Sequence, residues 1–80
     1  MVDYAAAAKL LEDNNYLVIS QNQNGDVVFC LPGLLGRHPQ YTILPINVDP
    51  IPDSVVIYNL RDRVPDADLE KLLGHPLPPK

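Results

Sequence analysis

Tyr16-Leu-Val-Ile-Ser-Gln-Asn-Gln-Asn-Gly-Asp-Val-Val-Phe-Cys-Leu31 contains two apolar runs, joined by a polar segment that includes Asn24-Gly25. Asn and Gly best tolerate the positive φ that a two-residue type I′ turn requires at both central positions. An Asn-Gly dipeptide between apolar runs is therefore the strongest short-range signal for a β-hairpin. We predict that residues 16–31 form a hairpin with a polar tip.

The predicted turn fixes a register in which Ser20 lies opposite Phe29 and Ile19 lies opposite Cys30. Side chains alternate between the two faces of a strand. One face would carry Tyr16, Val18, Phe29 and Leu31, and the other would carry Leu17, Ile19, Val28 and Cys30. An antiparallel sheet with one face in water alternates apolar and polar residues, and this hairpin does not. We therefore predict that both faces of the hairpin are covered.

The segments near the two ends of the chain predict helices. Residues 4–12 contain strong helix formers after the possible N-cap Asp3, and their apolar residues recur at the spacing of one helical face. Asn14-Asn15 suits the end of this helix, because Asn accepts the left-handed conformation. A second, shorter helix is predicted with Asp66 as its possible N-cap and Gly74 as its stop.

Two further apolar stretches, residues 41–46 and 54–60, predict a third and a fourth strand. Pro45 cannot donate a hydrogen bond to a sheet, so the third strand should lie at an edge or end there. The order predicts an α+β domain over residues 1–74, with an N-terminal helix, a four-stranded mainly antiparallel sheet and a short C-terminal helix. Residues 75–80 are rich in proline and predict a flexible tail.

The composition disfavours several classes of protein. Hydrophobic residues make up 46% of the 80-residue chain and charged residues 20%, which is the balance of one small folded domain. The formal net charge of −4 disfavours nucleic acids and anionic membrane surfaces as partners, because both attract Lys and Arg. No apolar run is long enough to span a membrane. A single cysteine, Cys30, cannot form an intramolecular disulfide, so we expect a cytoplasmic location.

The basic residues show one pattern that could form a binding site. Arg37 and His38 precede the predicted third strand, and Arg61 and Arg63 follow the predicted fourth strand. Antiparallel pairing of these strands would bring the four side chains to one end of the sheet, where they could bind a phosphate, a carboxylate or a protein partner. Alternatively, the last two arginines form ordinary ion pairs with a partner subunit or with Asp62, Asp66 or Asp68.

No combination of residues predicts catalysis, a metal site or a cofactor. His38 and His75 each precede a proline, and their spacing from Cys30 matches no zinc pattern. Apolar neighbours surround Cys30, which predicts a small buried hydrophobic residue and not a nucleophile. Ser20 and Ser54 lie outside any nucleophile motif. We therefore expect that the protein is not an enzyme and uses no cofactor.

Lys9-Leu-Leu-Glu-Asp-Asn-Asn-Tyr16, followed by the Asn-Gly hairpin, resembles the last helix and the wing of a winged helix-turn-helix domain. The resemblance covers residues 3–31 and implies a DNA-binding regulator. The helix in question carries one lysine and two acids, whereas contacts to phosphate need positive charge.

Two short helices do not suffice to cover both faces of four apolar strands, so the remaining face needs another surface. A homodimer that stacks sheet faces or pairs edge strands would supply it. We therefore predict a small acidic protein that binds a protein partner or itself, in an accessory, regulatory or inhibitor role. The alternatives are a small-ligand module that binds a phosphate or carboxylate at the arginines, and a winged-hairpin regulator of DNA.

Overall fold

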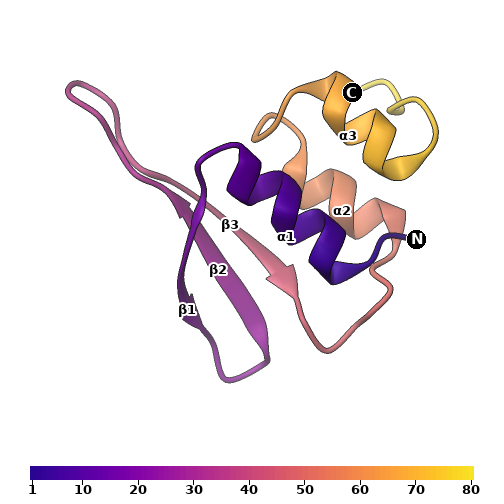
Figure 1. The fold of residues 1–80 in the computed structure, drawn as a ribbon, viewed down its shortest axis with the longest axis horizontal. Helices are drawn as coiled ribbons and strands as arrows, with labels where there is room; N and C mark the ends of the chain where they lie inside the picture. Colours follow the sequence, from indigo (N-terminus) through magenta and orange to yellow (C-terminus); the bar gives the residue numbers. More distant parts are fainter.

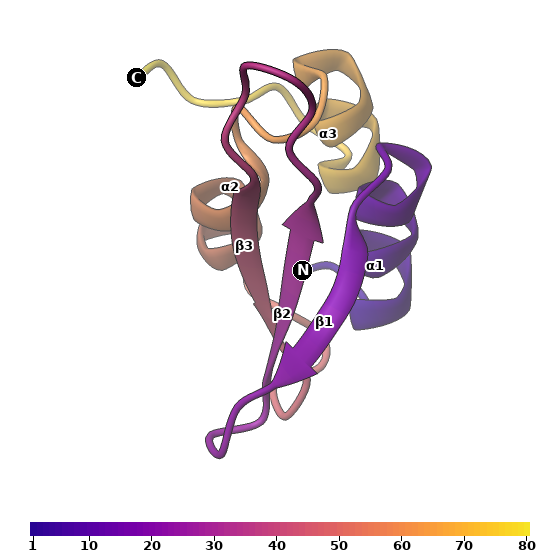
Figure 2. The same ribbon diagram turned by 90° about the vertical axis from the view of Figure 1, so that its left-hand side faces the viewer.

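The computed structural model describes residues 1–80, and its secondary structure confirms the α+β class. The elements follow one another in the order α1 (Tyr4–Asp13), β1 (Leu17–Gln21), β2 (Asp26–Leu31), β3 (Gln40–Pro45), α2 (Asp53–Leu60) and α3 (Asp66–Leu73) (Figure 1). The strands form one antiparallel sheet in the order β1-β2-β3. All three helices lie on the same side of this sheet, and its other side carries no helix (Figure 2).

The core lies between the sheet and the helices and contains 13 buried hydrophobic residues. Phe29 of β2 and Leu44 of β3 point toward the helices and are fully buried. The predicted apolar stripe of α1 is confirmed, since Ala7, Ala8 and Leu11 are its buried residues. Small alanine side chains let this helix lie close to the sheet.

The predicted hairpin forms, but the predicted two-residue turn is wrong. Asn22 N–H donates to the Asp26 carbonyl at 2.9 Å, so the loop contains the three residues 23–25. Of these, only Gly25 has a positive φ, at 89°. The side-chain Oδ1 of Asn22 accepts the backbone N–H groups of Asn24 (2.9 Å) and Asp26 (3.0 Å). These local hydrogen bonds favour the longer loop, which needs only one left-handed residue.

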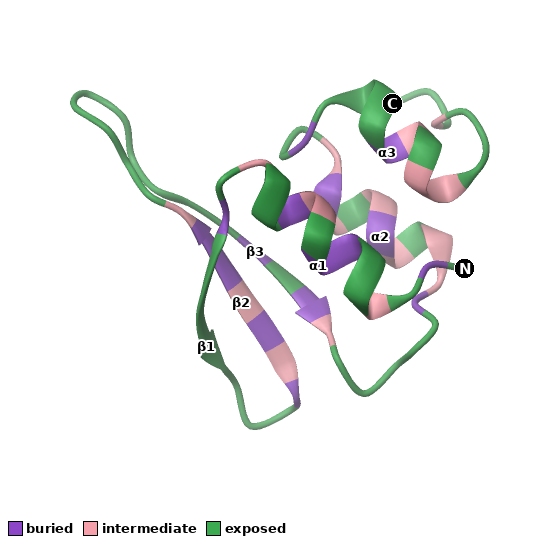
Figure 3. Cartoon of the chain, viewed as in Figure 1, coloured by how far each residue is buried: buried purple, intermediate pink, exposed green.

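The register of the hairpin also differs from the prediction, by the longer loop and by a bulge in β1 between Val18 and Ser20. Val18 pairs with Phe29, and Ser20 pairs with Val28. A bulge inserts one unpaired residue, here Ile19, and cannot be read from an alternating pattern. β1 is an edge strand of the sheet, and all five of its residues are exposed (Figure 3).

The predicted fourth strand is wrong, because residues 53–60 form helix α2. Its run of β-branched residues is typical of strands, but a short apolar run fits a buried strand or a buried helix equally well. In the helix, Val56 and Leu60 lie one turn apart and are fully buried, whereas Tyr58 points to solvent. The Thr42 hydroxyl of β3 donates to the Asn59 carbonyl at 2.6 Å and fixes α2 beside the sheet.

The three helices begin in the same way, and this repetition was a signal for α2 in the sequence. Pro52 and Pro65 are the N-cap residues of α2 and α3, with φ of −58° and ψ of 143° and 138°, and an aspartate follows each. The prediction of Asp66 as an N-cap is therefore wrong by one residue, because Pro65 already has the extended backbone of the cap and Asp66 is the first helical residue. In each helix, the residue before the N-cap and the fourth helical residue belong to the buried core, as in a hydrophobic staple: Val2 and Ala7, Ile51 and Val56, Val64 and Leu69.

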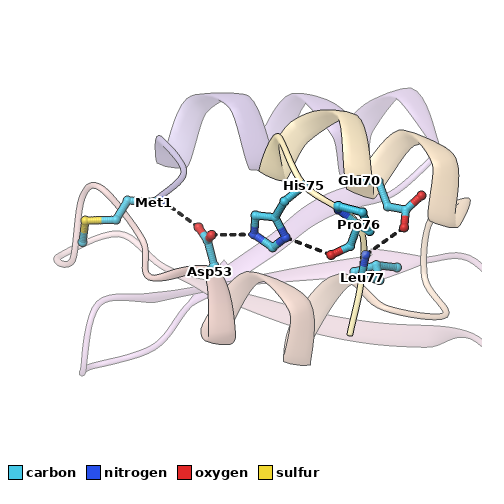
Figure 4. Close-up of polar contacts among 6 residues, drawn as sticks. All are labelled: Met1, Asp53, Glu70, His75, Pro76 and Leu77. Atoms are coloured by element: carbon cyan, nitrogen blue, oxygen red, sulfur yellow. Dashed lines mark hydrogen bonds and ion pairs between the residues drawn. The ribbon is translucent and has the colours of Figure 1, made fainter. Parts of the chain in front are cut away.

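Residues 75–80 have no regular secondary structure, yet they are tethered to the domain (Figure 4). His75 Nε2 lies 2.8 Å from Asp53 Oδ2, and Leu77 N–H donates to Glu70 Oε2 at 2.7 Å. Leu77 also packs against the core. The sequence predicted a flexible tail, and these contacts were not visible in its composition.

Candidate functional site

The helix-free side of the sheet presents a surface that we call the open face. Two rows of paired residues make up this face: Leu17, Cys30 and Tyr41, and then Ser20, Val28 and Ile43. Leu17, Tyr41 and Ile43 are exposed, and no side chain in either row carries a charge at neutral pH. Charged residues make up 20% of the chain, so the absence of charge distinguishes the open face from the rest of the surface.

The predicted basic residues occupy two different hollows. Arg61 and Arg63 follow α2 and border a hollow of about 510 Å³ beside β3, whose lining includes Tyr41, Ile43 and Tyr58. We call it the Arg–Tyr hollow. Its two tyrosines are more than half exposed, at 53% for Tyr41 and 87% for Tyr58.

Arg37 and His38 line a second hollow of about 630 Å³, together with Asn14 and Asn15 after α1. The connection that carries Arg37 and the connection from α2 to α3 lie at the same end of the sheet (Figure 2). The four predicted residues therefore share an end of the domain but line separate hollows. Their placement follows from α2, which runs beside β3 where a fourth strand was expected.

No arginine of the protein forms an ion pair or a side-chain hydrogen bond. The alternative that Arg61 and Arg63 pair with Asp62, Asp66 or Asp68 is therefore wrong for this structure. Asp62 instead binds Lys80 Nζ, at 2.8 and 2.9 Å from its two oxygens. Arg61 Nε is buried and has no partner.

Residues 32–39 form a finger that extends away from the domain between β2 and β3 (Figure 1). At its tip, Arg37 N–H donates to the Leu34 carbonyl at 2.8 Å, and Gly36 adopts a φ of 79°. The two arms lie so close that a Cβ on Gly33 would stand 2.5 Å from the Arg37 carbonyl oxygen. Leu34 and Leu35 are exposed on this finger. The projection of this segment was not predicted from the sequence.

A polar cluster around Asp53 links three segments of the chain. Its Oδ1 lies 2.6 Å from the Met1 terminal amine, and its Oδ2 lies 2.8 Å from His75 (Figure 4). The hydrogen bond from the terminal amine, and then that from His75, lowers the pKa of Asp53. The hydrogen bond between the imidazole and the Pro76 carbonyl, and then that to Asp53, raises the pKa of His75. The cluster joins the chain start, α2 and the tail.

The remaining titratable groups do not assemble into a further site. Cys30 is buried on the open face, between its neighbours Leu17 and Tyr41. No group of three His, Cys, Asp or Glu side chains is placed to hold a metal ion. A hollow of about 370 Å³ between α1 and α3 contains charges of both signs, among them Lys9 and Asp68.

Comparisons with protein families, with characterised proteins and with solved structures find no match for this chain. None of its helices combines the length and the apolar character needed to cross a membrane.

Proposed function

We propose that this protein binds other protein chains through its open face, as a homodimer or in a complex, and that it does not act as an enzyme. The observation that supports this proposal is the uncharged apolar face that no helix of the chain covers. Contiguous exposed apolar surface on a small domain is typical of protein interaction sites. An accessory, regulatory or inhibitor role in the cytoplasm belongs to the same proposal.

The electrostatics of the open face favour a second copy as one occupant. Two copies, each with a net charge of −4, repel one another at long range. Contact through a face without charges keeps the acidic residues apart and buries apolar surface, which contributes about 25 cal/mol per Å². A twofold axis through the face would place the same rows of residues against each other.

Sedimentation velocity over micromolar concentrations tests this proposal. We expect a concentration-dependent dimer for the natural chain, and a monomer for Ile43→Asp, which places a charge in the open face. Val48→Asp is the matched control, because Val48 is exposed in the loop after β3 and is not paired in the sheet. The proposal would be contradicted if the natural chain stays monomeric and retains no protein partner in affinity purification, so that it behaves in the same way as Ile43→Asp.

The second candidate function is a small-ligand module that binds a phosphate or carboxylate at the arginines. The lack of ion pairs at Arg37, Arg61 and Arg63 favours it. A ligand that binds only the folded state raises the midpoint of thermal unfolding, so a screen of inorganic phosphate and dicarboxylates tests this candidate.

The winged-hairpin regulator has no observation in its favour. Lys9, the one lysine of α1, lies 3.8 Å from Asp13. The hairpin loop, residues 23–25, carries no cation that could contact phosphate.

A further inference from the structure

The Arg–Tyr hollow carries positive charge that the protein itself does not neutralise. Arg61 and Arg63 flank Asp62, the one acidic residue of the lining, and Lys80 already binds both oxygens of that carboxylate. Two positive charges therefore remain uncompensated at this place in a chain with a net charge of −4.

The local backbone places both arginines in the lining of this hollow. Arg61 is the C-cap of α2, and its N–H donates to the Ile57 carbonyl at 2.9 Å. Asp62 adopts a φ of 65°, and Arg63 N–H then donates to the Leu60 carbonyl at 3.0 Å. This tight turn places two arginines on either side of one residue, at a defined spacing.

Arg61 also has an unmet requirement for an acceptor. Its Nε is buried without a hydrogen-bond partner. A buried donor without an acceptor destabilises the folded state, and hydrogen bonds that involve a charged group are the stronger kind. A carboxylate is a suitable acceptor, because the planar guanidinium binds its two oxygens in parallel.

The other half of the hollow is aromatic and aliphatic. Tyr58 projects from α2, and Tyr41 and Ile43 come from β3, where they also belong to the open face. Tyr and Arg are among the side chains that most often dominate the energy of protein interfaces. A ligand that satisfies this hollow therefore has an acidic part and an apolar part side by side.

We propose that the Arg–Tyr hollow binds an acidic segment of a partner protein, with a carboxylate at Arg61 and Arg63 and an apolar side chain against Tyr41 and Tyr58. Charge complementarity identifies this partner, since the hollow is a cationic site on an anionic protein. A small anion would leave the tyrosines and Ile43 uncovered. The inference goes beyond the proposed function, because the arginines and Tyr58 lie outside the open face.

Fluorescence anisotropy with a labelled peptide of alternating Glu and Leu residues tests this inference on the full chain. We expect the affinity for this peptide to fall as the salt concentration rises. The peptide in which Gln replaces Glu should bind at least about tenfold more weakly. Arg63→Gln, at an exposed position, should weaken binding of the acidic peptide about tenfold. Arg61→Lys should weaken it as well, since it keeps the charge but loses the planar donor pair.

Arg37→Gln is the matched control, because it removes the same charge from the other hollow and should leave the affinity unchanged. Equal binding of the Glu and Gln peptides, absence of binding, or an equal loss with Arg37→Gln would overturn the inference. Inorganic phosphate that displaces the peptide at similar concentration would also overturn it, in favour of a small-anion site. Sedimentation of Arg63→Gln separates a failure of this inference from a failure of the proposed function. The open face is intact in that variant, so it should form the same dimer as the natural chain.

Discussion

Asp53 and His75 lie 2.8 Å apart, although one begins α2 and the other follows α3. The imidazole bridges this carboxylate and the Pro76 carbonyl, so both of its nitrogens donate when it is protonated. The Asp53 carboxylate also receives the amine of Met1. Three segments that are distant in the sequence are thereby joined at a single side chain.

The first prediction concerns the pH dependence of stability at this contact. The pKa of His75 is raised from its ordinary 6.5 in the folded protein, so its stabilising effect is complete below that value and is lost as the pH rises through the raised pKa. The pKa of Asp53 is lowered from 3.8, so its contribution is present above that value and is lost in more acidic solution. His75→Gln should therefore lower the midpoint of thermal unfolding at about pH 5.5 and have little effect near about pH 8.5.

Circular dichroism melts at the two pH values measure this effect. Lys80→Gln, which removes another ion pair of the tail, serves as the control, because it leaves the contact between Asp53 and His75 intact. The same loss for His75→Gln at both pH values would show that the imidazole does not act through its proton.

The second prediction tests the helical state of α2. A strand would place Val56, Tyr58 and Leu60 on one face, whereas the helix buries the first and last and exposes Tyr58. Leu60→Ala should cost about 2 to 5 kcal/mol in the free energy of unfolding, and Tyr58→Ala should stay within about 0.5 kcal/mol of the natural chain. Urea denaturation measures both values, and similar losses for the two variants would favour the strand.

The third prediction separates backbone strain from steric conflict at two glycines with similar φ. Gly74 has a φ of 81° and open space around its position, so Gly74→Ala should cost only the strain of a left-handed alanine, about 1 kcal/mol. Gly25 has a φ of 89°, and an added Cβ would overlap the amide of Asn47. Gly25→Ala should therefore cost more than Gly74→Ala, and an additional Asn47→Ala should remove the excess. An unchanged excess in the double variant would exclude Asn47 as its cause.

The fourth prediction concerns a buried phenol. Tyr16 is fully buried, and its hydroxyl donates to Gln40 Oε1 at 3.3 Å. Tyr16→Phe should destabilise the protein by about 1 kcal/mol through the lost hydrogen bond, as measured in urea. Tyr41→Phe removes an exposed hydroxyl and should leave the stability unchanged, and an equal effect of both substitutions would contradict the role of the buried bond.

The sequence predicted those elements whose local signals agree with their tertiary environment. The stripe of α1 and its end near Asn14-Asn15, where Asn15 has a φ of 71°, are confirmed, and so is the helix that ends at Gly74. The fourth strand failed because Val55, Val56 and Ile57 favour strands by their branching, while packing against β3 decides their conformation.

The candidate site was predictable only in part. The sequence predicted that Arg61 and Arg63 lie at one end of the sheet. It did not predict that Tyr58 lines the same hollow, because this position depends on the helical geometry of α2. The ion-pair partners could not be predicted either. Asp62 pairs with Lys80 and not with the neighbouring arginines, and this pairing depends on the path of the tail. Long-range contacts of this kind leave no pattern in local spacing.

The exposed strand β1 also has a consequence for how the protein behaves in solution. It is a sheet edge of five uncharged residues, Leu17–Gln21, and the bulge at Ile19 is the one feature on it that opposes pairing with further strands. Edges without Lys or Pro act as templates on which other chains add strands and extend a sheet into fibrils. We therefore expect free protein to aggregate at high concentration, and a bound partner that covers β1 to act as its chaperone.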